Sequence, residues 1–169
     1  MIFYVCQKGL KQDEQNGRTL QKALNRPVWL LYWDAGLPFR KNLEAMSQEA
    51  WNNGDGFDVI AGEGMGGFYA LEAAKDITTC AVAFSPAMHP KERLTDQSAE
   101  VRGSYPDSLR VPEWLPVAGF ASENDPDIVL ARNFFSDFKV LGDGHWTEQP
   151  ECIETVRQYE NIIGNVPLD

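Results

Sequence analysis

The chain has 169 residues, of which 43% are hydrophobic and 24% charged, and its formal net charge is −10. This composition is typical of one globular domain and excludes a disordered chain. The negative charge disfavours nucleic acid as a partner, because it repels phosphate backbones. No apolar run approaches the roughly 20 residues that a membrane span requires, so we expect no membrane association.

Residues 1–6 lack the basic segment and cleavage site of a signal peptide and are expected to form a strand, with a cytoplasmic location as the default. The three cysteines lack metal-type spacing and the chain has only two histidines. We therefore expect no metal site and no cofactor. From the length of the chain we expect a single domain over residues 1–169.

Apolar runs alternate with segments of helical spacing along the whole chain. The run at 28–33 is unbroken, which is typical of a strand covered on both faces. We predict strands over residues 2–6, 28–33, 59–61, 78–84, 114–120 and 138–141. We predict helices over residues 15–25, 39–50, 67–75 and 128–135, and a closing helix from residue 153. Residues 85–112 are polar and predict a long excursion with at most one short helix. This alternation indicates a parallel sheet with helices on both faces.

A glycine-rich turn lies between the strand at 59–61 and the next helix. Gly62, Gly64, Gly66 and Gly67 follow a β-branched run, which predicts a strand, a very tight turn and a helix. The segment resembles the nucleophile elbow of α/β-hydrolases, G-x-S-x-G, in which the turn presents a serine above the sheet. Gly64 occupies the serine position. The motif is therefore present without its nucleophile.

The resemblance to α/β-hydrolases extends to two later loops in the family's chain order. Residues 121–129 resemble the acid loop, in which Asp125 matches the acid and Asp127 is the reserve. Residues 141–146 resemble the histidine loop, with His145 as the catalytic histidine. The resemblance implies a three-layer α/β/α sandwich whose six mainly parallel strands have the order 2-1-3-4-5-6, with residues 85–112 at the lid position.

The same resemblance implies an oxyanion site. The amide of Met65 would be one donor, at the start of the elbow helix, with help from Gln7 or Lys8 in the loop after the first strand. That loop lacks the family's frequent His-Gly. Three further residues are expected to line the pocket: Glu63, Ser85 and Trp146.

Other interpretations of these residues remain open. Asp125 before Pro126 is also typical of a helix N-cap, and Ser85 before Pro86 is typical of a turn. Gly62, Gly64 and Gly67 fit the dinucleotide fingerprint G-x-G-x-x-G, although no carboxylate ends the following strand.

The favoured hypothesis is a non-catalytic, esterase-related protein that binds a small acyl-bearing or ester ligand, or a protein partner. A carboxylesterase or thioesterase seen without its nucleophile is one alternative. In a second alternative, His145 activates water, or Glu63 or Ser85 takes part in catalysis. In a third alternative, the protein binds a nucleotide through the glycine turn.

Overall fold

The computed structural model describes residues 1–56, 58–77, 79–142 and 145–164. Six strands form one sheet: β1 (Ile2–Gln7), β2 (Val28–Trp33), β3 (Val59–Glu63), β4 (Cys80–Phe84), β5 (Val117–Ser122) and β6 (Asp137–Leu141). Their order is β2-β1-β3-β4-β5-β6, and all neighbouring pairs are parallel. The predicted fold class and strand order are confirmed. The chain reverses its direction of travel across the sheet between β1 and β3, and open α/β sheets bind ligands at such a point.

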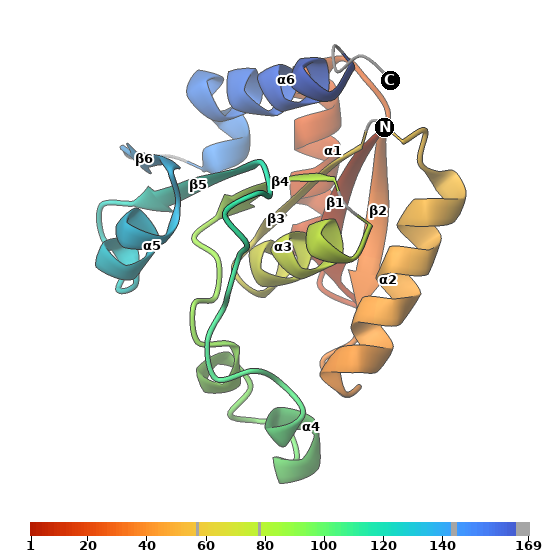
Figure 1. The fold of residues 1–169 in the computed structure, drawn as a ribbon, viewed down its shortest axis with the longest axis vertical. Coiled ribbons are helices and arrows are strands. Elements are labelled where there is room, and N and C mark those ends of the chain that lie inside the picture. Colours follow the sequence, from red (N-terminus) through yellow and green to blue (C-terminus); the bar gives the residue numbers. More distant parts are fainter. Residues whose placement is uncertain (57, 78, 143–144, 165–169) are drawn as a thin grey trace.

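Helices cover both faces of this sheet (Figure 1). They are α1 (Lys11–Leu24), α2 (Phe39–Asn53), α3 (Met65–Ile77), α4 (Ala99–Gly103), α5 (Ile128–Phe134) and α6 (Pro150–Gly164), with 3-10 turns at Pro90–Arg93 and Trp146–Glu148. Alternate residues of each strand point to opposite faces. Tyr4 and Cys6 of β1 therefore join a core with α1 and α6, whereas Phe3 and Val5 join a second core with α2 and α3. None of the described helices has the length and apolar character that a membrane crossing needs.

Several boundaries differ from the prediction. Helix α1 begins at Lys11, earlier than predicted. Its polar first turn carries no apolar periodicity, so the sequence pattern did not show it, and Asp13 and Glu14 stabilise this turn at the helix N-terminus. Strand β5 begins only at Val117, because the Leu115 amide donates to the Pro112 carbonyl and closes a turn before it. The excursion after β4 contains two short helical segments where at most one was predicted. Residue 78, where the fourth strand was predicted to begin, lies outside the described residues.

Strand β2 lies at the edge of the sheet, and its burial is incomplete although α1 and α2 contact its opposite faces. Leu31 and Trp33 are buried, but 42% of Trp29 and 39% of Tyr32 remain exposed. The Trp29 indole N–H donates to the Glu49 carboxylate of α2, which gives this half-exposed ring a polar partner. An unbroken apolar run therefore does not distinguish a central strand from an aromatic-rich edge strand.

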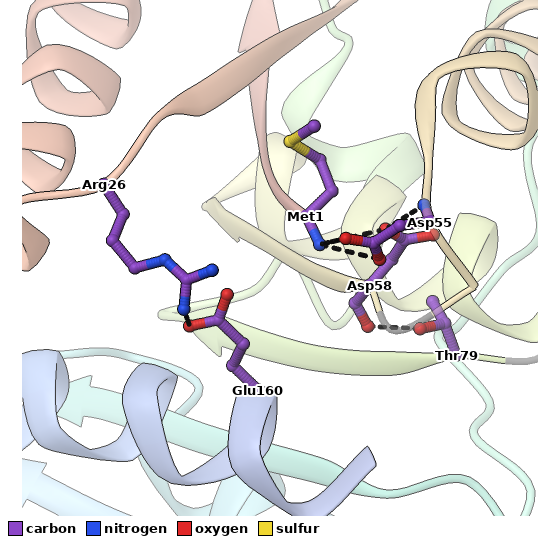
Figure 2. A network of polar contacts seen from close by, with 6 residues as sticks. All are labelled: Met1, Arg26, Asp55, Asp58, Thr79 and Glu160. Atoms are coloured by element: carbon purple, nitrogen blue, oxygen red, sulfur yellow. Dashed lines mark hydrogen bonds and ion pairs between the residues drawn. The ribbon is translucent and has the colours of Figure 1, made fainter. Parts of the chain in front are cut away.

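Polar contacts join the amino ends of the strands (Figure 2). The Met1 amino group lies 2.9 Å from the Asp55 carboxylate and 3.3 Å from the Asp58 carboxylate. The Thr79 hydroxyl donates to the Asp58 carbonyl, which links the entries to β3 and β4. Burial raises the pKa of the Asp58 carboxyl, and the adjacent positive amino group opposes that shift. These contacts are structural, whereas open α/β sheets bind their ligands outside the carboxyl ends of the strands.

A buried asparagine connects α2 with the excursion. The Asn42 side chain, 3% exposed, accepts from the Asp34 amide at 2.8 Å and donates to the Asp34 carbonyl at 2.9 Å. It also donates to the Tyr69 hydroxyl at 3.0 Å, and Tyr69 and Tyr105 hydroxyls lie 2.6 Å apart. Asn42 thus completes a hydrogen-bond network between α2, α3 and the chain before β5.

We expect Asn42→Ala to lower the free energy of unfolding by about 2–3 kcal/mol, because buried donors and acceptors lose their partner. Urea denaturation followed by circular dichroism measures the change. Asn52→Ala is the matched control: Asn52 is exposed on the same helix and, among the described residues, accepts only from Gln48, so its loss should stay within about 0.5 kcal/mol. Equal losses in the two variants would contradict the role assigned to the network.

Candidate functional site

The elbow is a strand, one left-handed residue and a helix. β3 ends at Glu63, Gly64 has φ +55°, and α3 begins at Met65. The Gly64 amide donates to the Phe84 carbonyl at 3.0 Å, while the Gly64 carbonyl accepts from the amides of Phe68 and Ala87. A Cβ built on Gly64 meets no atom within 4 Å. The backbone conformation and the space above it therefore suit a presented side chain, although glycine carries none.

The other glycines of the turn are required by close packing. A Cβ on Gly62 would lie 2.3 Å from the Gly66 carbonyl oxygen, and one on Gly66 would lie 2.7 Å from the Val5 carbonyl oxygen. A Cβ on Gly67 would come within 3.2 Å of Pro86. Contacts inside the domain thus account for these glycines without a nucleotide.

His145 faces the carboxylate that precedes Gly64. Its Nε2 lies 3.4 Å from Glu63 Oε2, and its Nδ1 lies 2.8 Å from the Thr147 hydroxyl and accepts from the Thr147 amide at 3.4 Å. Because an amide can only donate, Nδ1 is the acceptor in this network, and the imidazole hydrogen is assigned to Nε2, which faces the Glu63 carboxylate. In this tautomer, Nε2 cannot accept a proton.

Glu63 is the centre of the polar contacts at this edge. Its Oε2 accepts from the Trp146 indole at 2.9 Å and from the Asn16 amide group at 3.3 Å, in addition to facing His145. Alternation along β3 places Glu63 on the face covered by α1, where Asn16 lies. The sequence predicted Glu63 as a pocket residue but gave no sign that it would pair with His145, Trp146 and Asn16.

The two candidate acids have local partners. One Asp125 carboxylate oxygen accepts from the Asp127 amide at 2.8 Å, as in a turn before a helix, and the Asp127 carboxylate lies 3.7 Å from Arg93. Among the described residues, no hydrogen bond or ion pair joins either carboxylate to His145. Residues 143 and 144 of the histidine loop lie outside the described part. The role of Asp125 as acid remains a prediction.

At the end of β1, the backbone amides of Gln7 and Lys8 donate to acceptors within the protein. The Gln7 amide donates to Asp13 Oδ2 at 2.7 Å, and the Lys8 amide donates to the Trp33 carbonyl at 2.8 Å. The Lys8 ammonium lies 3.9 Å from Asp34 and is largely exposed. Burial raises the pKa of Asp13, with a smaller rise from Glu63, although the Gln7 amide opposes it. Of the predicted oxyanion donors, the amide of Met65 remains at the first turn of α3, where helices have no internal acceptor.

Ser85 follows β4 in a strained conformation, with φ +41°. Its amide donates to the Phe120 carbonyl at 2.6 Å, and residue 86 is a proline. A nucleophile in an elbow relies on the amide of the next residue to bind the oxyanion, and proline has none. Ser85 is therefore placed to contact a ligand but lacks this part of the machinery of a nucleophile.

The side chains of Glu63, Ser85, His145 and Trp146 line one cavity of about 130 Å³ at the carboxyl ends of β3 to β6. Register places Glu63 beside Phe84 and Phe84 beside Phe120, so all three point to the same face. The Trp146 and Phe84 rings stack at 3.5 Å between centroids, and the Phe84 and Phe120 rings at 5.2 Å. The remaining lining residues are Ala121, Ser122 and Leu141. Within the described ranges, no three His, Cys, Asp or Glu side chains are placed to hold a metal ion.

The parallel sheet, the strand order and the elbow with its left-handed glycine define an α/β-hydrolase-like fold. Among solved structures, the chain is similar to an esterase of the bacterial hormone-sensitive lipase family (TM-score 0.63, 13% identity, 96% of this chain and 75% of that one). It is also similar to a hyperthermophilic esterase from Pyrobaculum calidifontis (0.56, 13%, 96% and 75%) and to the Vlm2 thioesterase domain (0.54, 13%, 95% and 91%). At these identities the similarity shows the fold alone. No family model and no curated protein sequence matches the chain.

Proposed function

We propose that the protein is a non-catalytic member of this fold that binds a small ligand in the cavity beside Gly64. The observation that carries the proposal is the elbow itself, which keeps its left-handed turn and open space but has no hydroxyl at residue 64. The cavity holds about four water volumes, which favours a small molecule over a protein segment as its occupant.

Other groups in the cavity offer poor substitutes for the missing nucleophile. Ser85 precedes a proline, so its neighbour cannot donate to an oxyanion. The imidazole of His145 lies between Glu63 and Thr147, and its Nε2 faces the Glu63 carboxylate. Activation of water by His145 would require the opposite tautomer. These features support binding over catalysis.

A serine hydrolase without its nucleophile is the second candidate. The unobstructed position above Gly64 favours it, because a Cβ added there meets no atom within 4 Å. In that case the ancestral reaction would be hydrolysis of an ester or thioester, as the names of the esterases and the thioesterase domain suggest for those proteins.

Fluorophosphonate labelling and p-nitrophenyl acetate turnover test the proposal. We expect no labelled residue in the intact protein, and acetate hydrolysis equal to that of the His145→Ala variant. His145→Ala is the matched control because it removes the one imidazole in the cavity and leaves Gly64 unchanged. Labelling that mass spectrometry maps to Ser85, or turnover that His145→Ala abolishes, would overturn the non-catalytic proposal.

A further inference from the structure

The carboxylate of Glu63 is only half used by the protein. Its three donors, from Asn16, His145 and Trp146, all approach Oε2. Among the described residues, no donor contacts Oε1, and 39% of the Glu63 side chain is exposed. A carboxylate oxygen can accept more than one hydrogen bond, so Oε1 is available to a ligand in the cavity.

Two further acceptors line the same cavity. The hydroxyls of Ser85 and Ser122 form no hydrogen bond with any described residue; Ser85 directly follows β4, and Ser122 ends β5, the next strand of the sheet. Below them, Phe84, Phe120 and Leu141 give an apolar floor. The cavity therefore combines one carboxylate oxygen and two hydroxyls with a surface that accepts a short hydrocarbon chain.

Charge selects among the ligands that fit. Among the described lining residues, Glu63 is the only acidic one, and none is a lysine or arginine that would balance it. The amide of Gln7, which could attract an anion, already donates to the Asp13 carboxylate. An anionic ligand would lose its hydration and meet a carboxylate, which is costly, whereas a cation would gain a charge-assisted hydrogen bond.

We propose that the cavity binds a small primary ammonium ligand, whose three N–H groups are shared among Glu63 Oε1, Ser85 Oγ and Ser122 Oγ. Its short alkyl chain lies against Phe84, Phe120 and Leu141. The volume, about 130 Å³, accommodates a body of about four or five heavy atoms. This inference rests on the proposed function, since it names the chemical class that the binding site takes.

The test compares three probes of equal length: n-butylammonium, n-butanol and butyrate. The indole N–H of Trp146 reports occupancy in ¹H–¹⁵N spectra because it donates to the same carboxylate, and Trp146→Phe identifies its peak among the five tryptophans. We expect butylammonium to shift this peak saturably with at least about tenfold higher affinity than butanol, and butyrate to leave it unchanged.

Glu63→Gln keeps the size of the side chain and removes its charge. We expect it to weaken butylammonium binding about tenfold and to leave butanol binding unchanged. Glu148→Gln, an exposed residue of the same loop as Trp146, is the control for overall charge and should change neither affinity. If Glu63→Gln fails to fold, Ser85→Ala should still weaken butylammonium binding more than butanol binding.

The outcomes separate the two proposals. Butanol binding as tightly as butylammonium would overturn the ammonium assignment and leave the binding proposal standing. Butyrate as the tightest ligand would have the same meaning. No shift of the Trp146 peak with any of the three probes would overturn the binding proposal together with the assignment.

Discussion

Gly62→Ala is expected to lower the free energy of unfolding by about 3 kcal/mol or more, whereas Gly64→Ala should lower it by about 1 kcal/mol. At Gly62 the new Cβ would lie 2.3 Å from the Gly66 carbonyl oxygen and 2.8 Å from the Gly67 amide nitrogen. These are backbone atoms of the elbow helix, so relief requires α3 to move away from its own strand. At Gly64 the Cβ enters open space, and only the left-handed conformation opposes it.

Urea denaturation of the two alanine variants measures this difference directly. Domains are stable by about 5–15 kcal/mol, so a loss of this size is a large part of the total stability, and we expect thermal melting of the Gly62 variant to show a lower midpoint. If both variants lose the same free energy, the close packing of strand and helix does not explain why residue 62 is glycine.

The second large effect concerns recovery of a reactive serine. We expect Gly64→Ser to react only slowly with a fluorophosphonate, and Gly64→Ser combined with Asp13→Ala to react about a hundredfold faster. Serine at 64 would gain His145 Nε2 as a base once the imidazole hydrogen moves to Nδ1, where the Thr147 hydroxyl accepts it. The Asp13 carboxylate holds the Gln7 amide, and removing it frees that donor for the oxyanion.

Two controls separate this effect from general changes in charge. Gly64→Ala with Asp13→Ala lacks the hydroxyl and should not be labelled at residue 64. Gly64→Ser with Glu14→Ala removes a neighbouring carboxylate of α1 and should react like Gly64→Ser alone. Equal rates with and without Asp13 would show that this carboxylate does not block the site. No labelling in any serine variant would end the interpretation as a hydrolase that lost only its nucleophile.

Much of the fold could be predicted from local sequence signals. Backbone contacts force glycine at Gly62, Gly66 and Gly67, and a left-handed φ favours it at Gly64, so this glycine spacing predicts a strand, a tight turn and a helix. The alternation of strands and helices then leaves few arrangements of a parallel sheet. The edge position of β2 and its incomplete burial were not predicted, because the run 28–33 does not encode which side of the strand lacks a neighbouring strand.

The site was harder to predict because its contacts join distant segments. Glu63, Trp146 and Asn16 are far apart in sequence, and only the packing of α1 and the histidine loop over one face of β3 brings them together. The polar first turn of α1 gave no helical pattern, so the position of Asp13 beside the Gln7 amide was not foreseen. Resemblance to a family implied that His145 lies near the elbow with Asp125 as its acid, but gave no sign of the contact between His145 and Glu63.

The ion pairs in Figure 2 stand at the amino ends of the strands, whereas the cavity opens at their carboxyl ends. A strand of five residues separates these rims by about 16 Å, beyond the distance at which substitutions usually influence one another. The contacts that stabilise the fold and the candidate binding site thus lie at opposite ends of the strands. Substitutions at residue 64 and around the cavity can therefore change what binds there without weakening the contacts that stabilise the fold at the amino ends of the strands.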